Sequence, residues 1–213
     1  MKALLLKDLY NLWHQKNTIL WAFAIFTVFF LYFSGFAGYL PVCTVLFSQM
    51  ISTTFNLDHQ SNWTAYALTM PITRRQLAVS KFLMLLLLCG IGLGMSLILG
   101  VAFCTVTRDF GELKTPLRFL GAIAAALFFS LSSGSVTIAL FFRFGIEKAR
   151  MLKLFGLLLP AAALVIVILF LQKCFSVSDH TISLLLLFSP LLALLLMAGM
   201  IAYSEAVLRK KEW

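Results

Sequence analysis

Long apolar segments alternate with short polar ones along the whole chain. A bilayer core of about 30 Å is crossed by about 20 helical residues, so each long run without charged side chains predicts a membrane-spanning helix. Six such runs lie at residues 18–36, 41–57, 82–106, 119–142, 154–171 and 181–203, and none contains Asp, Glu, Lys, Arg or His. The pattern predicts an all-α integral membrane protein whose 213 residues form a single transmembrane domain.

The basic residues lie mostly in alternate connections. Thirteen of the 17 Lys and Arg residues fall in residues 1–17, 58–81, 143–153 and the tail after 203. Such residues accumulate in cytoplasmic connections, so we expect both termini to be cytoplasmic. The remaining connections are short, and we expect no extracellular domain. This distribution explains the net charge of +9 by membrane topology, without a nucleic-acid partner.

The N-terminal segment, residues 1–17, is amphipathic. Lys7 and Lys16 are among the residues that can face lipid headgroups. Residues sharing the apolar face of a helix here include Leu5, Leu9 and Trp13. We expect an interfacial helix that lies on the cytoplasmic surface and leads into the first span. The alternative is that these residues are only the frayed start of that span.

The connection at 58–81 carries its own helical pattern. Its apolar residues at the spacing of one helical face include Trp63, Tyr66 and Met70. Asp58 or Ser61 can cap the start of a helix here, and a proline directly after Met70 ends it. We therefore expect a short helix over about 60–69.

The sequence TRRQ at 73–76 predicts the start of the third membrane helix. Thr73 and Gln76 have the spacing of a capping box, which places Arg74 and Arg75 in the first turn. Cations there oppose the helix dipole, at a cost of about 0.3–1 kcal/mol each. Two explanations for the arginines stay open. They can bind anionic headgroups and thereby fix the topology, or they can pair with carboxylates of a cytosolic partner.

Several kinds of chemistry are missing from the sequence. No G-x-x-x-x-G-K-[ST] loop is present, so we expect no nucleotide hydrolysis and no enzyme activity from this chain alone. The serines at 130–136 have no histidine in the spans to act as a base. Spans without titratable groups also disfavour an ion-coupled carrier, although sodium sites made of carbonyls and hydroxyls stay open.

The second span has a polar stripe at helical spacing. It consists of Thr44, Ser48, Gln49 and Ser52. Polar side chains at this depth favour either a helix interface, such as a dimer face, or a water-accessible translocation path.

Six predicted spans, two cytoplasmic termini, an interfacial N-terminal helix and a short helix between the second and third spans form one pattern. Together with the segment LTMPITRRQLAVSKFL at 68–83, this pattern resembles the ABC-2-type permeases, the membrane subunits of type V ABC transporters. The stretch is similar to that family's Leu-Pro-[IV]-[ST]-[RK] segment before the third span, with Met70 where leucine is common. The resemblance implies that residues 58–72 form a coupling helix that docks on a separate ATP-binding subunit. Residues then expected at the interface are Asp58, Trp63, Tyr66, Met70, Arg74 and Arg75.

The same resemblance implies a complex of two permeases and two ATPase subunits in the cytoplasmic membrane of a bacterium. ATP and Mg would be bound by the partner, and no cofactor by this chain. The chain is most similar to the small permeases that export amphipathic peptides, such as phenol-soluble-modulin exporters. The alternatives are a stand-alone carrier or channel, and a membrane scaffold or immunity protein that sequesters a peptide.

Overall fold

The structure is a computed structural model that describes residues 2–63, 66–67, 73–107, 116–175 and 186–210. The described residues form the helices α1 (Lys2–His14), α2 (Lys16–Gln49), α3 (Ile51–Gln60), α5 (Arg74–Thr107), α6 (Pro116–Phe175) and α8 (Ser189–Lys210). No strand occurs in the described part of the chain. The all-α prediction is confirmed.

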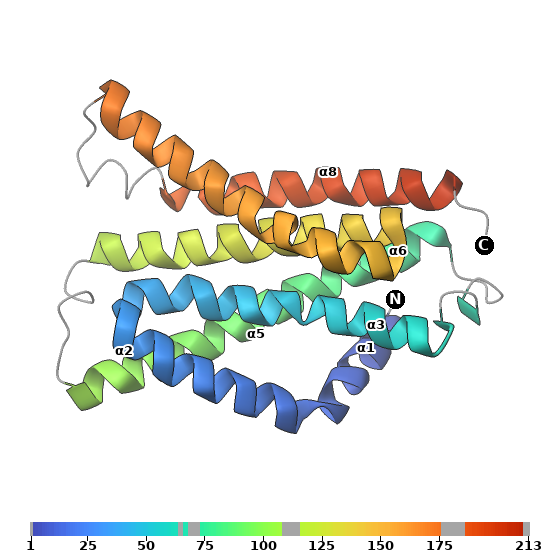
Figure 1. The fold of residues 1–213 in the computed structure, drawn as a ribbon, viewed down its shortest axis with the longest axis horizontal. Helices are drawn as coiled ribbons and strands as arrows, with labels where there is room; N and C mark the ends of the chain where they lie inside the picture. The colour runs from blue at the N-terminus through green and yellow to red at the C-terminus, as the bar shows by residue number, and fades with distance from the viewer. Residues whose placement is uncertain (1, 64–65, 68–72, 108–115, 176–185, 211–213) are drawn as a thin grey trace.

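Two of the long helices reverse direction at a glycine. Gly35 in α2 has φ 67° and Gly145 in α6 has φ 75°, a left-handed backbone conformation that residues with a Cβ rarely adopt. Each glycine therefore divides its helix into a first arm and a second arm, which run in opposite directions (Figure 1). The second arm of α2 continues almost directly into α3.

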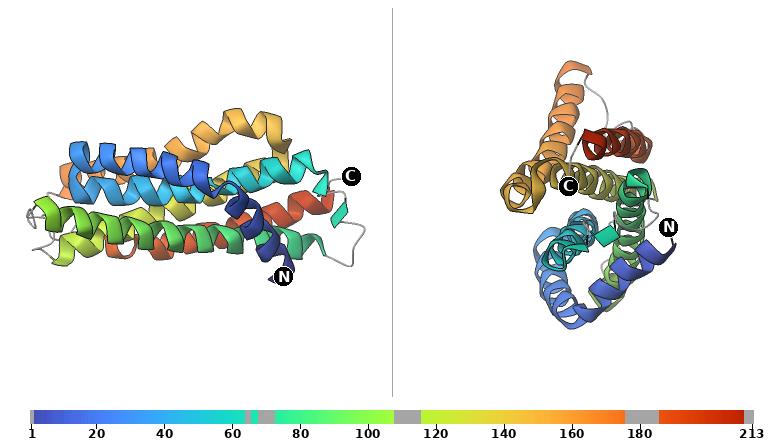
Figure 2. Two further views of the ribbon diagram at one scale, coloured as in Figure 1. Left: turned by 90° about the horizontal axis from the view of Figure 1, so that it is seen from below. Right: turned by 90° about the vertical axis from the view of Figure 1, so that its right-hand side faces the viewer.

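The helical arms run roughly along the long axis of the molecule, although the second arm of α6 diverges from it (Figures 1 and 2). The right-hand end in Figure 1 holds the end of α3, the start of α5, the break in α6 and the end of α8. The N-terminus and α1 lie in the same half of the molecule. We call this the N/C end.

Four helical segments are long and apolar enough to cross a membrane: Gly38–Gln60, Arg74–Val106, Phe119–Ala163 and Ser189–Arg209. A fifth is obtained if Ala3–His14 and Ile19–Phe33, bent by 72°, form one span. The described residues thus contain four to five candidate spans, where the sequence predicted six. The difference has two causes. The segment Phe119–Ala163 runs through the break at Gly145 and counts as one candidate span, and the first arm of α2 is a candidate span only when it is taken together with α1.

Glycines let α5 approach α2 closely. A Cβ at Gly100 would lie 2.3 Å from Cε2 of Phe36, and one at Gly92 would lie 2.6 Å from Cβ of Phe47. No real Cβ makes such contacts, so both phenylalanines occupy space that only glycine leaves open. Small residues have this role in membrane helices, where close packing replaces the hydrophobic effect.

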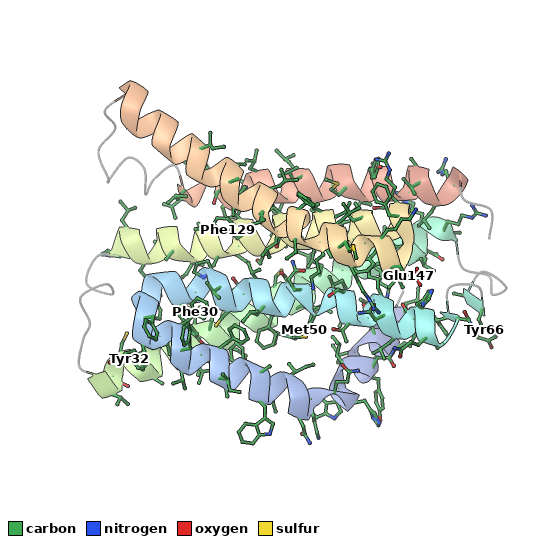
Figure 3. All side chains as sticks on the ribbon, in the orientation of Figure 1. Phe30, Tyr32, Met50, Tyr66, Phe129 and Glu147 are labelled. Atoms are coloured by element: carbon green, nitrogen blue, oxygen red, sulfur yellow. The ribbon has the colours of Figure 1, made fainter. Side chains whose placement is uncertain are left out.

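The outer surface of the bundle is strongly apolar. Trp21 and Tyr32 on the first arm of α2 are 73% and 80% exposed, and Leu195 on α8 is 70% exposed. Many large apolar side chains around them are exposed too (Figure 3). A surface of this kind is suited to lipid acyl chains and not to water.

Candidate functional site

Helix α1 buries a face with a charged residue at its centre. Leu4, Asp8 and Leu12 follow one another at intervals of one helical turn, and all three are buried. Leu9 and Trp13, from the predicted apolar face, are instead exposed on the surface of the chain. The helix is thus anchored to the bundle through one side and leaves apolar side chains on another.

Four charged side chains from three helices meet beside Asp8. The Lys81 ammonium lies 2.8 Å from Oδ2 of Asp8 and 2.6 Å from Oδ2 of Asp58. The Lys7 ammonium lies 3.1 Å from Oδ1 of Asp8 and also pairs with Oδ1 of Asp58. We call these four residues the charge cluster; it joins α1, α3 and α5 at the N/C end.

The charge cluster is buried but internally matched. The side chains of Asp8, Asp58 and Lys81 are 2%, 7% and 6% exposed. Two carboxylates and two ammonium groups balance, and Lys81 directs a third contact to Oγ1 of Thr54 at 3.5 Å. Oδ1 of Asp8 has an ion-pair contact with Lys7 but no hydrogen bond. Buried charges are tolerated when they are paired, whereas removal of one partner leaves an uncompensated charge.

An aromatic pair lies directly against the charge cluster. The Lys7 ammonium is 4.5 Å from the centroid of the Trp63 ring, within cation–π range. The Trp63 ring is in turn 5.6 Å from that of Tyr66. Tyr66 is 56% exposed and lies at the extremity of the N/C end (Figure 3).

The sequence left Asp58 or Ser61 as the cap of the short helix, and Asp58 does not have that role. Asp58 lies inside α3, which extends to Gln60, and its carboxylate is engaged by Lys81 and Lys7. The attraction of two ammonium groups in a buried site outweighs a backbone cap. The chain then turns at residues 61–62, and residues 63 and 66–67 of the predicted helix over 60–69 are helical. Residues 64–65 and 68–69, with Met70, lie outside the described residues.

The start of α5 shows both hydrogen bonds of a capping box. The Thr73 amide donates to Oε1 of Gln76 at 3.1 Å, and the Gln76 amide donates to Oγ1 of Thr73 at 3.2 Å. Helix α5 begins at Arg74, well before the expected span boundary at 82. Lys81, which the sequence analysis counted in the connection, is therefore a buried residue within a candidate span.

The two arginines contact the end of α8. Arg74 Nη1 donates to the carbonyl of Leu208 and, at 3.3 Å, to that of Arg209. Arg75 Nε lies 3.8 Å from Oε2 of Glu205, and the other carboxylate oxygen, Oε1, accepts a hydrogen bond from Arg209. A cation is favourable at a helix C-terminus, so the contact with α8 offsets the unfavourable position at the start of α5. This explanation adds to the two that the sequence left open.

The polar stripe of the second span packs against α6 of the same chain. Thr44 Oγ1 donates to the carbonyl of Ala126 at 3.3 Å. Gln49 Nε2 lies 3.5 Å from Oγ of Ser133. Nearer the N/C end, the Lys153 ammonium donates to Oγ of Ser52 at 2.8 Å. Ser48 is fully buried and bonds to the carbonyl of Val45. Within one chain the stripe is thus a helix interface.

Sequence reasoning named Asp58 but missed Asp8 and Lys81. The signal was present: Asp8 stands between Leu4 and Leu12 on one helical face, and a lone acid on an apolar face needs a buried partner. Among the described residues, no group of three or more His, Cys, Asp or Glu is placed to hold a metal ion. The ion pairs of the charge cluster join α1, α3 and α5, and its Lys7 contacts the Trp63 ring.

Packed apolar helices with a lipid-like exterior define a multi-pass membrane protein. The family described as "ABC-2 family transporter protein" matches residues 3–207, so the chain belongs to this family. It is the membrane permease component of an ABC-2 type transporter, which confirms the resemblance at the level of the family. Such components are typically non-catalytic, and the family implies an ATPase partner. No curated protein and no solved structure matches the chain.

Proposed function

We propose that this permease works as a homodimer with two separate ATP-binding subunits and exports amphipathic peptides. Six spans and two cytoplasmic termini complete the proposal. The position of the basic connections supports this topology, because the start of α5, the break in α6 and the end of α8 share the N/C end (Figure 1). One cytoplasmic surface at that end satisfies the positive-inside rule for all of them.

The observation that carries the proposal is the charge cluster beneath Trp63 and Tyr66. Lys7 contacts the Trp63 ring and pairs with Asp58 of α3, and Asp58 in turn pairs with Lys81 of α5. A partner that pushes on these rings therefore acts on three helices together. We assign Trp63, Tyr66 and Arg75 to the ATPase contact, with Met70 as predicted from the sequence, and Asp58 to the support beneath it because it is buried.

The peptide cargo follows from the similarity to small exporters and from the short connections opposite the N/C end. Large outer domains that capture a substrate have no room in connections of this length. An amphipathic peptide can instead enter from the membrane surface, because its apolar face is already in the headgroup region.

A paired aromatic variant tests the ATPase contact. Replacing both Trp63 and Tyr66 by alanine should abolish co-purification of the ATPase subunit while leaving the permease in the membrane. The matched control replaces Trp21 and Tyr32, an exposed Trp and Tyr on the first arm of α2. Association should survive in the control. Retention of the ATPase by the Trp63 and Tyr66 variant would refute the assignment.

A second measurement separates the permease from the other functional classes. The tagged chain is purified in mild detergent, the co-eluting proteins are identified, and ATP hydrolysis is measured with and without an amphipathic peptide. The proposal expects a soluble subunit with a phosphate-binding loop and peptide-stimulated hydrolysis. Flux driven by a gradient alone would support a carrier or channel, and peptide binding without ATP dependence would support a scaffold or immunity protein.

A further inference from the structure

The two arms of α2 enclose an apolar groove. Its cavity has a volume of about 160 Å³. The groove is lined by Ile19, Ala22, Phe23 and Phe26 from the first arm, by Leu46 and Phe47 from the second, and by Met50, which directly follows the second arm. Every one of these side chains is apolar. We call this cavity the arm groove.

The arm groove exists because the arms touch near Gly35 and separate toward the N/C end (Figure 1). Near the reversal, Thr27 Oγ1 lies 3.3 Å from the Tyr39 hydroxyl. Further along, the rings of Phe23 and Phe47 meet edge to face with centroids 4.8 Å apart. Beyond this pair the arms diverge, and Met50 lies beside the space between them (Figure 3).

The floor of the arm groove is fixed from behind. Phe47 fills the space that Gly92 leaves on α5, where an added Cβ would lie 2.6 Å from Cβ of Phe47. Phe47 therefore cannot turn away to close the groove without losing its packing on α5.

The open side of the arm groove is suited to an acyl chain. Ala22 and Phe26 at its edge are exposed, and Trp21 beside them is 73% exposed on the surface that faces lipid. The apolar lining offers no hydrogen bond to a polar occupant, which excludes a peptide backbone. An apolar cavity of about 150 Å³ accommodates benzene, so the arm groove takes about six carbons of a chain.

A basic residue lies at the wide end of the arm groove. Lys16 precedes Ile19 by three residues on the same helical face, a rise of about 4.5 Å along the axis. Its ammonium is 4.9 Å from the centroid of the Trp13 ring, and both side chains are exposed. Lys and Trp together are typical of the headgroup level of a membrane. The charge therefore favours an anionic headgroup above the chain.

We propose that the arm groove binds one acyl chain of an anionic phospholipid whose phosphate is held by Lys16. A second copy of the protein is a less suitable occupant of the groove. It would have to place an apolar side chain beside Lys16 at the groove mouth, and the charge of Lys16 disfavours this. The inference needs only a membrane environment, and it is independent of the ATPase contact and of the cargo.

The test counts lipids retained by the full-length protein. The protein is reconstituted in vesicles with equal amounts of phosphatidylglycerol and phosphatidylcholine, extracted in mild detergent and examined by native mass spectrometry. One retained phosphatidylglycerol is expected, with a preference of about fivefold over phosphatidylcholine, the ratio that one lysine near an anionic surface supplies. Ala22→Phe fills the groove and should abolish retention of both lipids.

Matched variants separate the chain from the headgroup. Lys16→Gln should retain one lipid but lose the preference for phosphatidylglycerol. Lys148→Gln, at another exposed lysine, should keep that preference. Ala24→Phe places the same bulk on an exposed position of the first arm outside the groove and should bind as the wild type does. Ala22→Leu, a smaller change, should reduce retention if the phenylalanine variant does not fold.

Three outcomes would overturn the proposal in whole or in part. Equal retention by the wild type and by both folded Ala22 variants would mean that the lipid is only part of the general lipid shell. Filling variants that reduce cross-linking between two copies, with lipid retention unchanged, would mean that the groove receives a second chain. Loss of the preference for phosphatidylglycerol in Lys148→Gln but not in Lys16→Gln would place the headgroup elsewhere.

Discussion

Replacing Lys81 by methionine should destabilise the protein more than any other single change of charge at the N/C end. Methionine keeps most of the length and the apolar stem of lysine but removes the ammonium. Asp8 and Asp58 would then share only Lys7, and the charge cluster would carry one uncompensated negative charge in a site that is almost closed to solvent.

The expected magnitude follows from burial. Breaking a buried ion pair by removing one partner costs about 3–5 kcal/mol, because the remaining charge is left unpaired. For a chain of 150–250 residues, each kcal/mol shifts the melting temperature by about 2–4 °C, which gives about 6–20 °C here. The two contacts of 2.8 and 2.6 Å place Lys81 at the upper part of that range.

The assay is the fraction of monodisperse protein that remains after heating in detergent. A second change, Asp58→Asn, restores neutrality in the Lys81→Met background, so the double variant should melt above the Lys81→Met single variant. Lys148→Met, at an exposed lysine, is the control and should change little. The charge argument is refuted if the melting temperature of the double variant falls by the sum of the two single decreases, or if Lys81→Met has the same melting temperature as the control.

Three further changes test the packing and the helix ends. Thr73→Ala removes half of the capping box at α5 and should cost about 0.5–2 kcal/mol, measured by the same heating assay. Gly100→Ala should destabilise the protein by about 1–3 kcal/mol because its Cβ would clash with Phe36 at 2.3 Å, whereas Gly90→Ala, with nothing within 4 Å, should be neutral or stabilising. Arg74→Ala should loosen the end of α8 by about 1–2 kcal/mol and raise its amide hydrogen exchange, and Arg74→Lys should recover part of the loss.

The helical architecture was predictable because membrane helices follow simple rules. Runs of apolar residues without charge must be helical in lipid, where each backbone polar group needs a partner within its own segment. The positions of Gly35 and Gly145 were visible too, since both occur where the predicted spans end. Their backbone conformations were not, and these conformations break α2 and α6 into two arms that run in opposite directions.

The charge cluster was harder to predict because its parts are far apart in the sequence. Lys7 and Lys81 entered the topology count as basic residues of connections, and Asp8 was not singled out. Nothing local shows that they meet. Only the packing of α1 across the start of α5 and the end of α3 brings them within 2.6–3.1 Å of a partner.

The two adjacent arginines now have separate explanations. Arg74 donates to the last carbonyls of α8, where a cation is favourable, and this contact compensates for its position in the first turn of α5. Arg75 is 75% exposed, and its distance of 3.8 Å from Glu205 leaves the guanidinium at the surface. An exposed ion pair contributes little to stability, so the second arginine is free to exchange Glu205 for a headgroup phosphate or a carboxylate of the ATPase. The pair therefore combines one residue that contacts the end of α8 with one that is exposed at the surface, where the proposed ATPase contact would lie.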